Sequence, residues 1–387
     1  MTPSLITDCI EHLLLPLHAW RAGYNEDRYG WGADELFADE TTLKEYPHAY
    51  AVWGTGYAAL YDLTRAASFR THALACGHWL RRHPNPMHAN LAWGLPLDFE
   101  NTGRHYAYAI TTLYVADLFF DLYRLSGDER WREALLSIRK WLLEDNGYTI
   151  DYRHSRGIWF HYSPNPEFTA AVYNVTAKAA GFFARLARLP DARRAEDDYF
   201  ATGCIRYLLA RQAPGGGWLY DDKGSKIDLI HTALTIDGLA DFALSSRHLG
   251  VEVSAALYRS VRFAARHLIT RSGFAYEGFP VLLAAPGALR NPQQPIIEMI
   301  KRGWFPRSRL ETRTYGYAMA LKAIAKARQA VPQLGPVNLG PLTRHMVRAH
   351  RTPEGTFRFS ARCPHLYIRA QGHIFDGLAV YTACLAS

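Results

Sequence analysis

The sequence has few cysteines and no long apolar run, and both shortages exclude classes of protein. Its five cysteines are odd in number, widely spaced and without a CxxC pair, so we expect no disulfide framework and a reducing, cytoplasmic location. No segment approaches the roughly 20 apolar residues that a membrane span needs. The first residues lack the basic start of a signal peptide, and Asp8 and Glu11 interrupt their apolar stretch.

Long runs of positive charge are also missing. The net charge of +8 comes from 44 basic and 36 acidic residues dispersed along the chain, which does not predict a nucleic-acid surface but is compatible with an acidic partner. Aromatic residues are plentiful, with 23 Tyr, 18 Phe and 10 Trp, together with 17 His. Most of them belong to a core, but such rings with polar edges also suit a ligand cavity.

Apolar residues at helical spacing recur along almost the whole chain. Short turns such as Ser126-Gly127-Asp128 alternate with long loops rich in Gly and aromatics, so the helices are expected to form antiparallel hairpins. The spacing predicts twelve helices, at 3–22, 49–66, 68–83, 104–126, 128–144, 167–189, 192–212, 229–249, 252–270, 311–331, 337–350 and 367–385.

The long loops resemble one another, because each places a Gly-containing turn before a short aromatic piece. Successive turns, at Gly147, Gly216, Gly273 and Gly355, are about 57 to 82 residues apart, a period that indicates a repeat architecture. Twelve helices make six hairpins if the first pairs with the last. We therefore predict an all-α fold, an (α/α)6 toroid with short β-like turns in its long loops. An open solenoid and two helical bundles are the alternatives.

The toroid would use residues 1–387 as one domain, although length alone suggests two or three. Helices entered from long loops, near 49, 104, 167, 229, 311 and 367, should form its inner layer. Residues 280–310 interrupt the regular rhythm with four prolines that precede a basic segment. We expect either a lid over the ring or an exposed loop there.

All six inner N-termini would open on one face and aim unpaired N–H groups at a shared cavity, which favours an anionic ligand. The residues at these entrances are mostly polar and aromatic. As candidate acids and bases we select His105, Tyr173, His231 and Tyr315. As candidate binding residues we select His48, Arg104, Asn174, Trp218, Asp228, Arg313, Arg369, Gln371 and His373.

One stretch also carries a family resemblance. The pattern WxYxD followed by IDxxHTxxxxDGL, which begins at Trp218, and the preceding YNVTAKAAG helix resemble bacterial exopolysaccharide-biosynthesis proteins of the helical-toroid type. Those proteins are similar to squalene-cyclase-like and polysaccharide-lyase toroids. The resemblance covers mainly residues 165–245. It implies the toroid and a sugar-polymer context, and it identifies no nucleophile.

The residue types at the entrances favour proton abstraction next to a carboxylate, because His and Tyr can move the proton while Asn, Gln and Arg stabilise the enolate. The leading hypothesis is therefore a lyase or uronate epimerase that acts on an acidic glycan in polysaccharide biosynthesis or modification. A glycoside hydrolase with a carboxylate pair is one alternative. A glycan-binding or scaffold protein without catalysis is another.

We predict no cofactor and no metal, since His72, Cys76 and His78 lack a convincing further ligand. The expected partner is an acidic oligosaccharide or polysaccharide. Contact with polysaccharide-assembly proteins is also expected, and nucleic acid is not.

Overall fold

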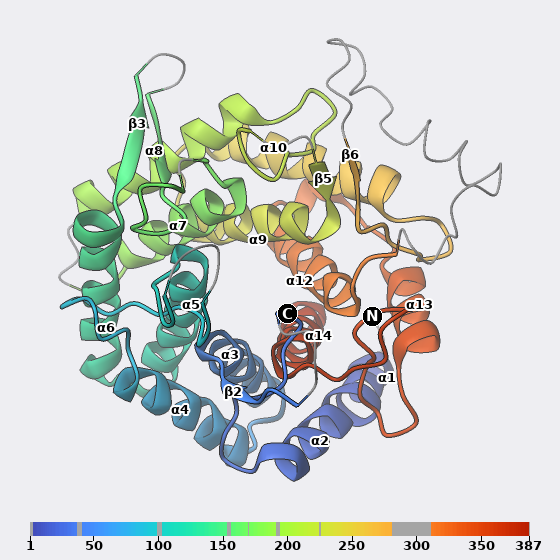
Figure 1. The fold of residues 1–387 in the computed structure, drawn as a ribbon. Coiled ribbons are helices and arrows are strands. Elements are labelled where there is room, and N and C mark those ends of the chain that lie inside the picture. The colour runs from blue at the N-terminus through green and yellow to red at the C-terminus, as the bar shows by residue number, and fades with distance from the viewer. Residues whose placement is uncertain are drawn as a thin grey trace.

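The helices form a closed two-layered ring in a computed structural model of the chain (Figure 1). The structure describes residues 3–36, 41–98, 103–152, 156–168, 170–190, 194–223, 226–280 and 311–386. Within this part the inner layer consists of α3 (Pro47–Thr64), α5 (Ala109–Ser126), α7 (Tyr173–Leu186), α9 (Leu229–Ser245), α12 (Thr314–Ala330) and α14 (Ile368–Ala386).

The outer layer is formed by the helices that follow the short turns, together with the first helical segment of the chain. Three of its segments include a π-helical turn. Its elements are α1 (Pro3–Cys9), η1 (Ile10–Leu14) and α2 (Leu15–Asn25); α4 (Ala67–Arg82); α6 (Glu129–Lys140) and η2 (Trp141–Asn146); α8 (Arg194–Arg211); α10 (Gly250–Phe263) and η3 (Ala264–Leu268); and α13 (Gly340–His350), preceded by the 3-10 turn η6 (Pro332–Leu334).

Contacts between helices close the ring as the sequence predicts. Each inner helix packs against the next, from α3 through α5, α7, α9 and α12 to α14, and α14 returns to α3. The first helix of the chain packs against the last, since α1 and α2 both contact α14. The predicted all-α toroid and its inner and outer layers are therefore confirmed.

The long loops contain short antiparallel strand pairs. They are β1 (Trp31–Gly32) with β2 (Lys44–Glu45), β3 (Tyr148–Asp151) with β4 (Gly157–Phe160), and β5 (Lys226–Asp228) with β6 (Gly278–Pro280). Two of the predicted glycine turns need glycine for two reasons. Gly216 and Gly273 have φ of 97° and 87°, and a Cβ would lie 2.5 Å and 1.9 Å from a backbone oxygen of a neighbouring helix.

Two inner helices begin later than predicted. The helix expected from 104 starts at Ala109, because His105 has a φ of 61° and Ala107 forms a β-bridge with Gly94. The helix expected from 167 starts at Tyr173, because Val172 forms a β-bridge with Asp221. In both places loop pairing competes successfully with helical periodicity.

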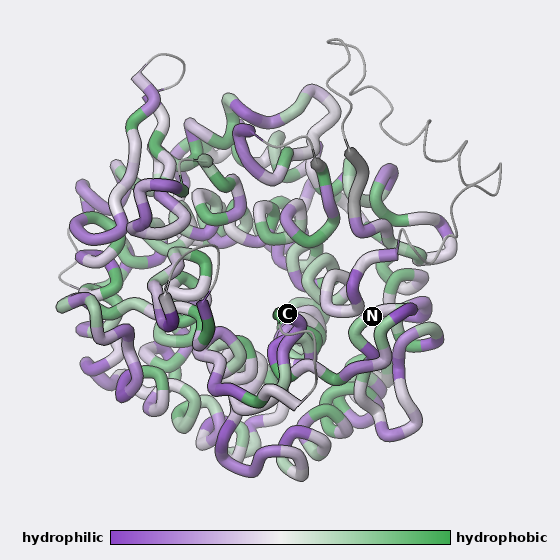
Figure 2. The backbone as a smooth tube through the Cα atoms, viewed as in Figure 1, coloured by the Kyte–Doolittle hydropathy of each residue, from purple (hydrophilic) through white to green (hydrophobic). Residues whose placement is uncertain are grey.

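Burial differs between the layers. In α7 every residue from Tyr173 to Ala184 is buried, whereas α6 buries one stripe, Trp131, Ala134, Leu135, Ile138 and Arg139, at helical spacing. Figure 2 shows the corresponding hydrophilic segments along the outer edge of the ring. Small residues let the inner helices approach: a Cβ on Gly238 of α9 would lie 2.4 Å from the backbone of Ala177 in α7.

No helix in the described ranges is long and apolar enough to cross a membrane. Of the candidate lid, residues 281–310 lie outside the described part of the chain. That the chain forms a single domain stays a prediction.

Replacing Gly238 by alanine should destabilise the ring, because the new methyl group has no room between α7 and α9. We expect a loss of about 3 kcal/mol in the free energy of unfolding, measured by urea denaturation. Gly250→Ala is the matched control, since a Cβ there meets nothing within 4 Å, and it should change stability by less than about 1 kcal/mol. Equal effects of the two substitutions would contradict the close approach of α7 and α9.

Candidate functional site

The first turns of the six inner helices surround a cavity of about 360 Å³ on the loop face of the ring. It lies within the size range of small-ligand sites. Its lining mixes aromatic, polar and apolar side chains. The residues are Glu35, Leu36, His48, Leu95, Tyr108, Ile110, Thr111, Tyr114, Tyr162, Asn174, Tyr220, Ile230, His231, Leu234, Arg313, Tyr315, Met319, Arg369 and His373.

The structure brings seven of the selected residues together on this cavity. They come from five of the inner helices and from the residue that precedes α12. They are His48, Asn174, His231, Arg313, Tyr315, Arg369 and His373.

The other six selected residues do not line the cavity. Tyr173 is buried with its ring 6.1 Å from that of Tyr207, and the Trp218 indole donates to the backbone of Leu208. Gln371 is fully buried and exchanges hydrogen bonds with the backbone of Phe357. The side chains of these three residues therefore contact other parts of the protein and do not face the cavity.

Arg104 and His105 are exposed in the loop before α5, because that helix begins later than predicted. Asp228 is only 2% exposed and does not line the cavity itself. It contacts His231, which does.

Asp228 fixes the orientation of His231. One carboxylate oxygen caps α9 by accepting from the His231 backbone N–H at 2.8 Å, and the other lies 2.7 Å from His231 Nδ1. The Tyr220 ring lies edge-on to the imidazole, with ring centres 4.4 Å apart. With Nδ1 held by a carboxylate, Nε2 is the nitrogen that can exchange a proton with a ligand.

An ion cluster forms another wall. Glu35 accepts from Arg313 at 3.1 Å, from Arg369 at 2.9 Å and from the Tyr315 hydroxyl at 3.2 Å. Arg369 also forms a bidentate pair with Asp34 at 2.8 and 2.9 Å. Burial raises the pKa of the Tyr315 hydroxyl well above its usual value, and Glu35 adds to the effect.

Sequence reasoning missed Glu35 and Asp34, which lie on the loop between the outer helix α2 and α3. The rule that site residues occur at inner-helix entrances gives no signal for them. Tyr114 and Tyr162 were missed for different reasons: Tyr114 lies deeper in α5, and Tyr162 follows β4.

Stacked rings form the deep part of the cavity. The His373 ring stacks on Tyr315 with centres 5.4 Å apart, and it meets His48 and Tyr114 edge-on at 4.9 and 5.2 Å. Burial holds the pKa of His373 well below its usual value, and the positive charges of Arg369 and the buried lysines lower it further. His373 is therefore neutral at neutral pH, as a general base must be.

Polar atoms on the cavity wall lack partners within the protein. They are Asn174 Oδ1, His48 Nε2 and Arg313 Nε, all buried. Buried polar groups are rarely left unpaired, so these atoms indicate a wall suited to a polar ligand.

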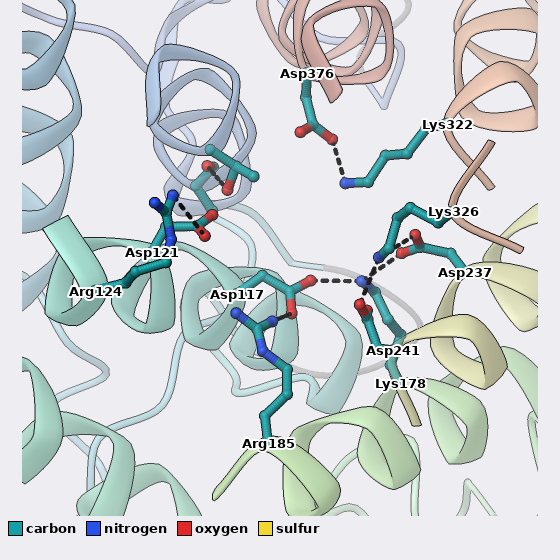
Figure 3. Close-up of polar contacts among 12 residues, drawn as sticks. Asp117, Asp121, Arg124, Lys178, Arg185, Asp237, Asp241, Lys322, Lys326 and Asp376 are labelled. Atoms are coloured by element: carbon teal, nitrogen blue, oxygen red, sulfur yellow. Dashed lines mark hydrogen bonds and ion pairs between the residues drawn. The ribbon is translucent and has the colours of Figure 1, made fainter. Parts of the chain in front are cut away.

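A buried ion-pair network lies beneath the cavity at the centre of the ring (Figure 3). Lys178 of α7 bonds Asp117 of α5 and Asp237 of α9, and Lys326 of α12 bonds Asp237 at 2.6 Å and Asp241 at 2.7 Å. Lys322 of α12 bonds Asp376 of α14 at 2.8 Å.

The network reaches the cavity through a small gap of about 10 Å³, which is lined by His373, Asp376, Lys322 and Asp237 among others. Burial opposes charge here, yet Asp117 and Asp237 hold the pKa of Lys178 well above its usual value. The lysines thus stay charged next to His373.

Glu311, His345 and His350 form a separate cluster outside the cavity, with ligand atoms within 4.8 Å of one another. Glu311 Oε1 lies 2.8 Å from Nε2 of both histidines and accepts from the Tyr317 hydroxyl at 2.8 Å. His350 Nδ1 is buried without a partner. A metal-bound imidazole usually donates from its second nitrogen, so the geometry fits hydrogen bonding better than metal binding.

No protein-family model matches this chain, and no curated protein matches it either. Solved structures do. A polysaccharide lyase superposes with a TM-score of 0.64 at 10% identity, covering 99% of this chain and 98% of its own. A glycosyl hydrolase family 88 protein from Bacteroides vulgatus gives 0.64 at 9%, covering 99% and 100%. Cellobiose 2-epimerase from Spirochaeta thermophila gives 0.64 at 14%, covering 97% and 96%.

At these identities the likeness shows a shared fold. Because the same fold supports different reactions in different proteins, the residues of the cavity, and not the fold, indicate the reaction.

The Glu311 cluster makes a pH-dependent contribution to stability. Burial favours the neutral acid, but hydrogen bonds from His345, His350 and Tyr317 outweigh it and lower the pKa of Glu311 from 4.5 to about 2. A lowered pKa stabilises the folded state above pH 4.5, and this stabilisation is lost as the pH falls toward 2.

We therefore expect Glu311→Gln to lower the free energy of unfolding by about 3 kcal/mol at pH 7, and the deficit to shrink below about pH 4.5. Urea denaturation across this pH range measures both. Glu354→Gln, at an exposed loop position, is the control and should have no effect. A deficit that stays constant with pH would show that the carboxylate charge is not the cause.

Proposed function

We propose that this protein is a carbohydrate-active enzyme that removes a proton from a sugar carbon next to a carboxylate or carbonyl group. The observation that carries the proposal is that two of the three imidazoles on the cavity, His231 from α9 and His373 from α14, have different surroundings. His231 contacts a carboxylate, whereas His373 lies among cations. Two such groups in different surroundings suit opposite roles in proton transfer.

In the proposed reaction neutral His373 takes the proton from carbon, and the electron pair moves into an enolate. His231, which Asp228 holds at Nδ1, donates a proton from Nε2 to the same carbon from its other side. This exchange inverts the carbon and gives epimerisation. If the enolate instead expels the glycosidic oxygen from the adjacent carbon and His231 donates its proton to that oxygen, the same first step gives β-elimination, the lyase reaction.

Arg313 and Asn174 are suited to hold the enolate oxygens, because each has a buried polar atom without a protein partner. The two arginines support an acidic glycan as substrate. A uronate carboxylate would compete with Glu35 for Arg313 and Arg369, and the unpaired Nε of Arg313 provides one further donor.

The carboxylate-pair hydrolase fits this cavity less well. Glu35 is the one carboxylate among the described residues that line it, and its oxygens are paired with Arg313, Arg369 and Tyr315. Two further buried acids lie elsewhere: Asp237 is in the central network, and Glu311 is in the histidine cluster.

A role in exopolysaccharide biosynthesis or modification is part of the proposal, and its support is the sequence resemblance over residues 165–245. A cytoplasmic location and contact with polysaccharide-assembly proteins stay predictions.

Solvent deuterium incorporation tests the reaction. The protein is incubated in heavy water with uronate-containing oligosaccharides and, separately, with neutral ones. Exchange at the carbon next to the carboxylate without an unsaturated uronate or new reducing ends indicates epimerisation, and absorbance of an unsaturated uronate indicates a lyase. New reducing ends alone would indicate a hydrolase, and no change in any assay would overturn the enzyme in favour of a glycan-binding protein.

His231→Gln and His373→Gln should each reduce this exchange by about 10²- to 10⁴-fold, because each removes one proton-transfer group. His12→Gln, at an exposed position of η1, is the control and should exchange at the native rate. Native activity in either cavity variant would remove that histidine from the mechanism.

Asp228→Asn separates the charge of Asp228 from its capping role, because asparagine caps helices as well as aspartate does. We expect kcat to fall by about 10- to 100-fold with little change in KM or in unfolding temperature, and the pH profile to shift. An unchanged kcat would show that the reaction does not depend on the orientation of His231 by the Asp228 carboxylate.

A further inference from the structure

A second groove, of about 290 Å³, lies outside the central cavity between the β3–β4 hairpin and α8. Tyr152 and Trp159 come from the hairpin, Tyr207 and Arg211 from the end of α8, and Asp222 from the loop that follows. Figure 1 shows β3 and α8 at the outer edge of the ring. We call this site the rim groove.

The rim groove and the cavity share a wall. The extended segment 220–222 pairs with residues 171–173 before α7: the Tyr173 N–H donates to the Tyr220 carbonyl at 3.2 Å, and the Ala171 N–H donates to Asp222 Oδ1 at 2.8 Å. Tyr220 lines the cavity, and Asp222 lines the groove. Two residues of extended chain span roughly 7 Å, so the sites are close neighbours.

The groove offers one aromatic ring that is open to solvent. Tyr152 is 77% exposed, an unusual position for a large ring. Trp159 is half-buried and packs against Tyr207 with ring centres 5.1 Å apart. Flat aromatic faces with open access suit the apolar C–H face of a sugar ring.

Charged groups complete the groove and indicate the type of sugar. Arg211 bonds Asp151 at 3.2 Å, and its Nε is buried without a partner. Two carboxylates, Asp151 and Asp222, accompany this single guanidinium. Carboxylate and guanidinium groups together can bind sugar hydroxyls, whereas the excess of negative charge disfavours a phosphate or a uronate.

We propose that the rim groove is a second sugar subsite, which binds a neutral hexose unit of an oligosaccharide whose reacting unit occupies the cavity. The position of the reacting unit rests on the proposed function. The substrate is then an oligosaccharide or polysaccharide that crosses the wall at residues 220–222, and a single sugar uses only the cavity.

Binding measurements with ligands of graded length test this subsite. Calorimetry of the full chain uses two series, cello-oligosaccharides from glucose to cellohexaose and hyaluronan fragments of increasing length, which alternate uronate and neutral units. In at least one series we expect the affinity to rise by about five- to tenfold once the ligand reaches the groove. Affinity that does not increase with length, or no binding in either series, overturns the proposal.

Substitution of Tyr152 tests whether the rise in affinity with ligand length arises in the rim groove. Tyr152→Ala should abolish the rise with length and leave the affinity for the shortest ligand unchanged, while Tyr152→Phe should keep the rise because it keeps the ring. Tyr199→Ala is the matched control: this tyrosine on α8 is 53% exposed and lies outside the groove. A rise with length that survives in Tyr152→Ala overturns the groove as the site.

The two proposals fail in different ways. Deuterium exchange into a sugar without any effect of chain length would overturn the rim groove alone. A Tyr152-dependent rise in affinity without exchange would overturn the proposed reaction and leave the subsite in place.

Discussion

The buried ion-pair network at the centre of the ring is the interaction on which the rest of the structure depends. Six inner helices cannot fill the axis of a ring with apolar side chains alone, and in this protein Lys178, Lys322 and Lys326 extend across it to aspartates on neighbouring helices. Breaking such a pair by removing one partner leaves an uncompensated buried charge, which is far more costly than the pair itself is stabilising. The network therefore fixes how α5, α7, α9, α12 and α14 approach one another, and it forms the floor of the cavity.

The ion-pair network also influences the protonation of His373, which lines the cavity. His373 and Asp376 lie one turn apart on α14, so the histidine that lines the cavity lies directly above the aspartate that Lys322 binds. Burial raises the pKa of Asp376, whereas it lowers that of His373, and the charged lysines reinforce the effect on the histidine. The lysines that hold the ring together thus add to the effect of burial and of Arg369, which keep His373 unprotonated on the cavity wall.

Sequence reasoning could predict the ring and the level at which the site lies, because both follow from alternating short turns and long loops. His231 and His373 were found by this rule, since each lies in the first turns of an inner helix. The rule does not specify which way a side chain points. Asn174 lines the cavity while its neighbour Tyr173 packs against Tyr207, because consecutive helical residues diverge by about 100°.

Other parts of the site depend on contacts that no local pattern encodes. Glu35 joins the cavity from a loop nearly 280 residues before Arg313, and only the closed ring brings the two together. The central claim is that burial, with Arg369 and the buried lysines adding to its effect, keeps His373 neutral. Nitrogen NMR of the imidazole rings between about pH 5 and 8 tests it most directly. The account predicts that His373 keeps the shifts of a neutral ring throughout, and a His373 that takes up a proton near its ordinary pKa would contradict it.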